Sequence, residues 1–256
     1  QRIVVIDFGR VYVQMACFEH SATGFTLLAY DVRDTSLPQV FEKEASEFIR
    51  SFMARYFLSG NEATLTISDP EVVFTKHFSL PHMVRTEMQE AIKLQMKLEL
   101  SFSPEESIFD YQVVSEYSDA EQVRKVNVVS IYSKRSVIEK FISLAKENNL
   151  FVVKISSAPF DYAAILHQWE SNSSVTALLD VGTRYTFLAL YKNARLIFIR
   201  PLGFSFLKLK LSLCGTVTTD ECKIEISPEK ADTILKAMGI PRNSSAAGEG
   251  SVSSQC

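Results

Sequence analysis

The chain has 256 residues and a mass of 28.8 kDa, which suits one large domain or two small ones. Hydrophobic residues make up 46% and charged residues 22%, a globular composition that excludes wholesale disorder and fibrous repeats. With 27 basic and 30 acidic residues the formal charge is −3, which gives no support to nucleic-acid binding. The apolar runs are far shorter than the roughly 18 residues of a membrane span, so none is expected.

The predicted elements begin with three short β-rich runs between Ile3 and Tyr30, separated by turn residues. Such runs are typical of an antiparallel meander. Apolar residues then recur at helical spacing through Pro38–Leu58, which predicts an amphipathic helix. A strand is expected at Ala63–Ser68.

The next stretch alternates strands and helices. A strand is predicted at Val72–Leu80, and Pro81 is expected to open a helix that runs to about Leu100 with Met88 and Ile92 on its inward face. A βαββαβ-like pattern is completed by two further strands at 108–115 and 124–132, a helix at 136–148 and a strand at 151–155. A helix at 160–169 follows.

The chain then repeats its opening. The segment Ala177–Phe187 has the outline of Ile3–Val13, and each copy contains an Asp-x-Gly tripeptide, the two being 173 positions apart. Apolar runs and turns continue alike after both copies, so we predict a second meander and two related half-domains. A helix at Pro228–Met238 precedes a Ser/Gly-rich end.

An Asp-x-Gly turn after a buried strand has a use in nucleotide sites. Glycine lets the backbone approach a phosphate, and the carboxylate can hold the hydration shell of Mg²⁺. A single copy is weak evidence, because the same tripeptide is ordinary hairpin chemistry. Two copies, each at the head of a meander, are a sharper signal.

At this point the chain resembles the actin, Hsp70 and sugar kinase superfamily, and within it the PilM-type pilus assembly proteins, related to FtsA and to type II secretion GspL cytoplasmic domains. The motifs that carry the resemblance are Phe78-Ser79-Leu80-Pro81, Glu90-Ala91-Ile92, Phe109-Asp110-Tyr111-Gln112-Val113 and Ile199-Arg200-Pro201-Leu202-Gly203. The resemblance implies an α/β, actin-like (ribonuclease H-like) fold with an inserted IC subdomain and an incomplete second lobe. The chain is therefore expected to be a fragment.

The resemblance also divides the chain into parts. Subdomain IA is expected at 1–75 and 156–172, and the inserted subdomain IC at 76–155. A partial second lobe, IIA, is expected at 173–241, followed by a flexible tail at 242–256.

For a nucleotide, the resemblance implies two phosphate loops that bind ATP, with Mg²⁺ held through Asp7 and Asp180. Arg10 stands where the family usually has a small hydroxyl residue, and Gln14 replaces the usual Lys. We therefore expect a degenerate or weak ATPase at most, and no catalytic residue is assigned. The residues implied for the two loops are Asp7, Gly9, Arg10, Gln14, Asp180, Gly182, Thr183 and Gly203.

For a partner, the resemblance implies a protein on the cytoplasmic face of a bacterial inner membrane that holds the cytoplasmic tail of a PilN-like membrane protein in a groove between IA and IC. It would also meet other pilus or secretion platform proteins, without inserting into the membrane. The groove residues expected are Phe78, Leu80, Met88, Ile92 and Tyr111, each of which is also a natural core residue.

Three classes of function stay open on the sequence. The favoured one is an actin-like scaffold of a type IV pilus or a related type II secretion machine. The second is an active ATPase or kinase of the same superfamily, which would need a catalytic carboxylate and an adenine loop. The third is an FtsA-like division protein, which would need a C-terminal amphipathic helix.

Overall fold

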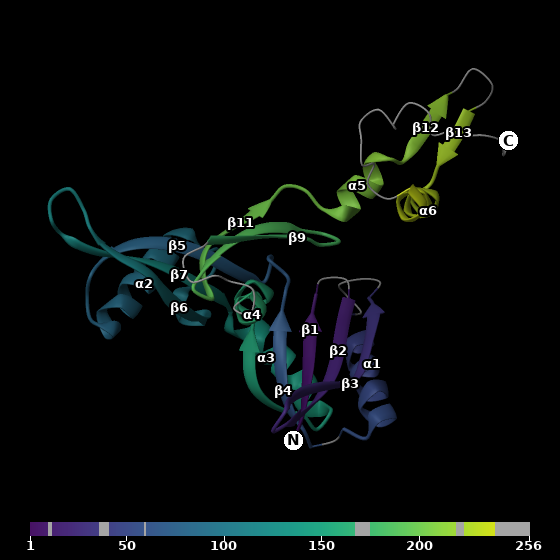
Figure 1. Cartoon of the computed structure of the whole chain (residues 1–256), viewed down its shortest axis with the longest axis horizontal. Helices are drawn as coiled ribbons and strands as arrows, with labels where there is room; N and C mark the ends of the chain where they lie inside the picture. The colour runs from purple at the N-terminus through teal and green to yellow at the C-terminus, as the bar shows by residue number, and fades with distance from the viewer. Residues whose placement is uncertain (10–11, 36–40, 59, 167–174, 219–222, 239–256) are drawn as a thin grey trace. The chain divides into compact units, whose positions relative to one another are not determined.

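The computed structural model describes residues 1–9, 12–35, 41–58, 60–166, 175–218 and 223–238 (Figure 1). The chain divides into two compact units, one made of residues 1–178 and 189–199 and the other of residues 179–188 and 200–256. No helix in the described ranges is long and apolar enough to cross a membrane.

The first unit is built on a five-stranded sheet in the order β3-β2-β1-β4-β8. β1 lies antiparallel to β2 and parallel to β4. Alternation along β1 buries Val4, Ile6 and Phe8 on one face of this sheet. The strands are β1 (Arg2–Phe8), β2 (Tyr12–Ser21), β3 (Gly24–Asp34), β4 (Glu62–Ile67) and β8 (Phe151–Ser156).

Two helices cover the buried face of this sheet, α1 (Phe41–Tyr56) and α3 (Arg135–Glu147) (Figure 1). Phe48 and Phe52 of α1 join Leu144 of α3 and the β1 side chains in one hydrophobic cluster. The opposite face meets α4 (Ala158–Leu166), because the Thr66 hydroxyl on β4 donates to Asp161 at 3.0 Å. On the opposite face, α4 thus contacts the sheet at β4.

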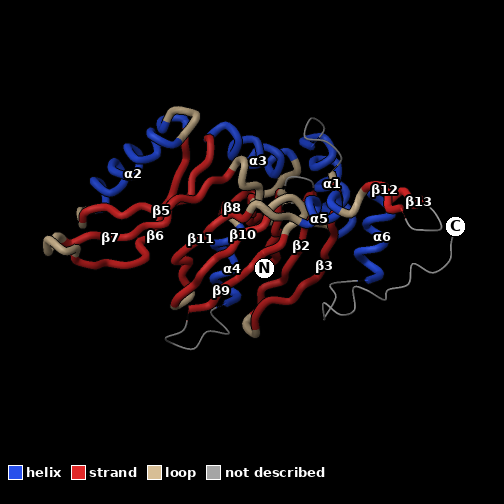
Figure 2. Tube along the Cα trace, turned by 90° about the horizontal axis from the view of Figure 1, so that it is seen from above, coloured by secondary structure: helices blue, strands red, loops and turns tan. Residues whose placement is uncertain are grey.

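The inserted subdomain is a separate antiparallel sheet in the order β5-β7-β6, with α2 on one face (Figure 2). Met88, Ile92 and Met96 of α2 are buried against Phe78 and Leu80 of β5, which confirms the predicted inward face of this helix. The elements are β5 (Val73–Pro81), α2 (Arg85–Glu99), the short 3₁₀ helix η1 (Pro104–Glu106), β6 (Ser107–Ser118) and β7 (Arg124–Lys134).

The structure corrects two predicted boundaries of this insert. The sequence assigns the helix at 136–148 and the strand at 151–155 to the insert, whereas α3 packs in the core of the five-stranded sheet and β8 pairs with β4. A parallel pair needs a crossover connection, and the insert with α3 supplies it. Pro81, expected to open a helix, ends β5 instead, and α2 begins at Arg85.

The second predicted meander forms a three-stranded sheet in the order β11-β10-β9. Tyr191 on β10 is fully buried and its hydroxyl donates to the Pro159 carbonyl at 2.7 Å, which ties this strand to α4 within the first unit. The strands are β9 (Val175–Val181), β10 (Thr186–Lys192) and β11 (Arg195–Leu202).

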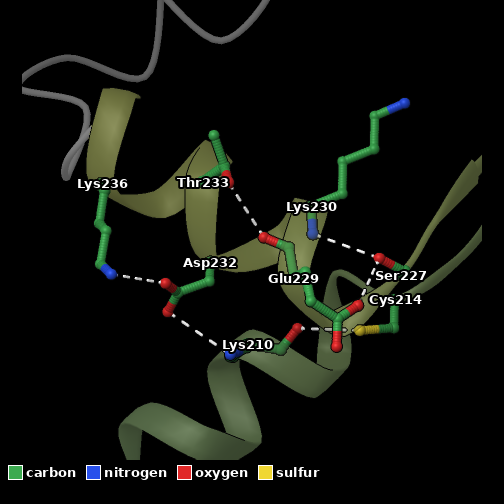
Figure 3. Close-up of polar contacts among 8 residues, drawn as sticks. All are labelled: Lys210, Cys214, Ser227, Glu229, Lys230, Asp232, Thr233 and Lys236. Carbon is green, nitrogen blue, oxygen red and sulfur yellow. Dashed lines mark hydrogen bonds and ion pairs between the residues drawn. The ribbon is translucent and has the colours of Figure 1, made fainter.

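The second unit also contains elements that the sequence does not predict, namely α5 (Phe206–Ser212), β12 (Gly215–Thr218) and β13 (Lys223–Ile226). The predicted last helix is α6 (Pro228–Met238), whose first turn Ser227 caps by accepting from the Lys230 N–H at 3.3 Å. Asp232 of α6 lies between Lys210 of α5 (3.5 Å) and Lys236 (2.6 Å), so the two helices share a carboxylate (Figure 3). The tail expected at 242–256 lies outside the described residues.

Candidate functional site

The first Asp-x-Gly turn connects β1 to β2. The Gly9 N–H donates to the Tyr12 carbonyl at 3.1 Å and closes the turn. Both carboxylate oxygens of Asp7 accept a hydroxyl, Oδ1 from Ser68 at 2.7 Å and Oδ2 from Tyr12 at 3.2 Å. Gln14 lies opposite Asp7 in the β1–β2 ladder, and Arg10 falls outside the described residues.

The aromatic ring of Tyr12 lies directly over this turn. A Cβ added at Gly9 would come within 2.3 Å of the ring carbon Cζ. The glycine therefore leaves room for the chain's own tyrosine, whose hydroxyl reaches back to Asp7. The surface over Gly9 that a phosphate would approach is occupied by a side chain.

The second Asp-x-Gly turn, described within its own unit, has the same backbone geometry. The Gly182 N–H donates to the Tyr185 carbonyl at 2.9 Å, and a Cβ at Gly182 would meet that carbonyl oxygen at 2.6 Å. The carbonyls of Gly182 and Thr183 accept from Phe206 (3.0 Å) and Leu207 (2.8 Å) at the start of α5. The turn that follows Asp180 is thus hydrogen-bonded to the first residues of α5.

Gly203, the last residue implied for this loop, has a different setting. Its carbonyl accepts from Lys208 Nζ at 2.8 Å, and nothing lies within 4 Å of an added Cβ. No close approach requires a glycine there.

The fit of these residues to Mg-ATP can be judged at the first turn. A phosphate needs open backbone N–H groups and Mg²⁺ needs carboxylate oxygens, but the Gly9 N–H closes the turn, Asp7 accepts two hydroxyls, and the Tyr12 ring covers the glycine. With Tyr12 in this position, the described part of the turn leaves no room for a phosphate against Gly9. No chemical step through ATP follows from it.

The residues expected to line a peptide groove lie in the core of the insert. Phe78, Leu80, Met88 and Ile92 are buried between α2 and the sheet, and Tyr111 packs against the same cluster. The sequence analysis named such a core position as the alternative for each of these residues. Contact of these five side chains with a peptide stays a prediction.

The structure has an accessible apolar groove elsewhere, where the insert joins the five-stranded sheet. It has a volume of about 320 Å³, and Ile108 on its rim is 41% exposed. We call it the junction groove; its lining residues are Ile67, Val73, Ile108, Phe109, Asp110, Ile131, Tyr132, Ser133, Ile138, Ile155 and Ser156.

Sequence reasoning missed this groove, although a signal for it exists. Ile108 and Phe109 on β6, like Ile131 and Tyr132 on β7, are consecutive apolar residues on strands, so both faces of the sheet are apolar there. One face is covered by α2. The other is the face that carries Ile108 and Ile131.

A second and larger groove, of about 1040 Å³, lies between the insert and the β10–β11 hairpin. We call it the hairpin groove; its lining residues are His77, Phe78, Ser79, Val114, Ser115, Asn127, Val128, Lys192, Asn193, Arg195, Ile197 and Phe198.

His77 of β5 connects the two walls of the hairpin groove. Its Nε2 atom accepts from the Ile199 N–H at 3.1 Å, and its ring stacks on Phe198 with 5.3 Å between centroids. Partial burial lowers the pKa of His77; the Ile199 carbonyl, 3.3 Å from Nε2, can accept only from the protonated ring, and it opposes this lowering only in part. The neutral form of the ring therefore fits this contact.

The comparisons with known proteins agree with this architecture. The family described as "Type IV pilus assembly protein PilM" matches residues 6–243. The PilM-PilN type IV pilus biogenesis complex contains a similar structure, with a TM-score of 0.72 at 17% identity, over 93% of this chain and 70% of that one. The cytoplasmic domain of EpsL, an inner-membrane component of the type II secretion system of Vibrio cholerae, gives 0.51 at 9% identity, over 83% and 74%.

No curated protein sequence matches the chain significantly. The structural likeness establishes the fold, which is an actin-like α/β fold with an insert after β4. The family match covers nearly the whole described chain. The chain therefore belongs to the PilM family of type IV pilus assembly proteins.

Proposed function

We propose that this protein is an actin-like scaffold of a type IV pilus assembly platform, which holds the cytoplasmic tail of a PilN-like inner-membrane protein in the junction groove. It would act at the cytoplasmic face of that membrane. The family match supports the pilus role, and a similar structure comes from a complex of PilM with PilN.

The observation that carries the proposal is the junction groove itself. Short peptides are held mostly by apolar side chains in pockets and by backbone hydrogen bonds. Ile108, Ile131 and Ile155 supply apolar surface from three strands, and Ile108 is exposed in the absence of a partner. Among the residues that the structure describes, Asp110 is the only charged one that lines the groove, so a largely apolar segment is the best fit.

The proposal does not depend on a nucleotide. The first turn is closed by Tyr12, whereas the junction groove lies at the far side of β4, formed by Ile67, β8 and the insert. A scaffold that binds its partner in this groove needs no Mg-ATP to do so.

The test is the affinity of the full chain for a synthetic peptide with the cytoplasmic N-terminal tail of the PilN-like protein from the same genome. Ile108→Glu places an unpaired charge on the groove rim and should weaken binding at least about tenfold, which equals about 1.4 kcal/mol. Leu94→Glu is the matched control, because Leu94 is 64% exposed on α2 and does not line the groove.

Calorimetry measures both affinities, and circular dichroism checks that both variants fold. Equal weakening by Ile108→Glu and Leu94→Glu would place the tail elsewhere. An unchanged affinity for Ile108→Glu would refute the junction groove as the site.

A further inference from the structure

We propose that the hairpin groove is a second docking site, which takes an extended acidic peptide segment with apolar anchor residues. Its volume of about 1040 Å³ slightly exceeds the roughly 300–1,000 Å³ of small-molecule sites, and it is open to solvent. A stretch of polypeptide fills such a groove better than a compact ligand.

The charge of the groove selects an acidic occupant. Lys192 and Arg195 line it, and no Asp or Glu of the described part of the chain is among its lining residues. Within the described ranges neither cation has an acidic partner. Glu116, which follows the lining residue Ser115, is already paired with Arg124 at 3.0 Å. The whole chain has a net charge of −3, so the positive charge of this rim is opposite in sign to the net charge of the protein.

The hairpin turn brings the two cations together. Only Asn193 and Ala194 separate β10 from β11, both with positive φ (51° and 56°), as in the tight two-residue turns of β-hairpins. The residues that flank such a turn lie opposite each other, and like charges in that position repel. A carboxylate from a partner would relieve this repulsion between Lys192 and Arg195.

Apolar surface lies next to these charges. Ile197 and Phe198 line the groove from β11, and Val114 lines it from the insert, with Phe198 36% exposed. Leucine-like anchors can pack there while neighbouring carboxylates meet the rim. Alternating apolar and acidic residues in an extended chain match this arrangement, since successive side chains point to opposite sides.

The probe for the test is a fluorescein-labelled (Leu-Glu)₄ peptide, compared with (Leu-Lys)₄ and (Ser-Glu)₄ in polarisation titrations of the full chain. We expect (Leu-Glu)₄ to bind at least tenfold more tightly than either comparison peptide, and more weakly as salt is raised. The double variant Lys192→Glu/Arg195→Glu should lose at least tenfold for (Leu-Glu)₄ and gain for (Leu-Lys)₄. Both residues are exposed, so their replacement leaves the core intact.

Two controls make the outcome decisive. Arg50→Glu/Lys146→Glu changes the net charge equally on α1 and α3, away from the groove, and should leave the affinity unchanged. Ile108→Glu in the junction groove should also leave it unchanged. Absent binding of (Leu-Glu)₄, equal loss in both charge-reversed variants, or loss on Ile108→Glu would each overturn the proposal. None of these results bears on the PilN-tail proposal, which is tested separately by the binding of the tail peptide to the junction groove.

Discussion

The contact between Gly9 and the Tyr12 ring predicts a strong energetic coupling between these two residues. In Gly9→Ala the new methyl would lie 2.3 Å from Tyr12 Cζ, more than an ångström inside the roughly 3.5–4.0 Å of normal carbon contacts. The ring is the far end of a side chain, so it can rotate away. It then loses its hydrogen bond to Asp7 Oδ2, which is 3.2 Å long.

The magnitude follows from these contacts. A hydrogen bond to a charged group contributes about 1.5–3 kcal/mol, and we take the lower end because this bond is long and half-exposed. Gly9 has no left-handed φ, so alanine there also restricts the unfolded chain, a gain of about 0.4–1 kcal/mol. Gly9→Ala should therefore cost about 1 kcal/mol with Tyr12 present and become neutral or stabilising in Tyr12→Ala.

The assay is a double-mutant cycle on the free energy of unfolding, measured by urea denaturation with far-UV circular dichroism. We expect a coupling of about 1–2 kcal/mol between the two substitutions. Additivity within about 0.5 kcal/mol would refute the reasoning, because it would mean that the ring does not lie over the glycine.

Gly182 provides the contrasting control. A Cβ there meets the backbone oxygen of Tyr185 at 2.6 Å, which no side-chain rotation can relieve. Gly182→Ala should therefore destabilise its hairpin with or without the Tyr185 side chain. Rescue by Tyr185→Ala would contradict the geometry of this turn.

Three further outcomes are expected. Ile92→Ala removes a fully buried side chain from the core of the insert and should lower the free energy of unfolding by about 2–5 kcal/mol in urea titrations; a cost below about 1 kcal/mol would show that Ile92 is accessible. Thr186→Val should be neutral or stabilising by about 1 kcal/mol in thermal unfolding, because the Thr186 Oγ1 atom is buried without a partner among the described residues; Val13 holds the equivalent place in the first repeat, and a clear destabilisation would mean that the hydroxyl is bonded. The lowered pKa of His77 means that the unfolded chain takes up its proton first, near pH 6.5; stability should therefore fall as pH drops below about 6.5, and an unchanged slope in His77→Gln would contradict this.

Local features of the sequence predict much of this fold. Both meanders form, and their glycines make the same turn, because turn chemistry and strand alternation act over a few residues. The inward face of α2, with Met88 and Ile92, follows from helical periodicity alone. These are short-range signals, and no distant residue is needed to interpret them.

Long-range contacts account for what could not be predicted. The strand at Phe151–Ser156 is recognisable, but its partner, β4, is chosen by packing of α3 on the distant β1 and α1. The closed state of the first turn depends on the rotamer of Tyr12, which no motif specifies. The two grooves arise where separately predicted elements meet, so no contiguous run of residues marks them.

The parallel pairing of β4 with β8 has a consequence for how the chain folds. The whole insert and α3 lie between these two strands, so the central sheet cannot be completed until all of them have been synthesised and the two ends brought together. Closing so long a connection costs chain entropy before the strand contacts form, which slows folding. An insert that folds early shortens the effective connection. Substitutions in the α2 core should therefore slow the refolding of a sheet that they never touch.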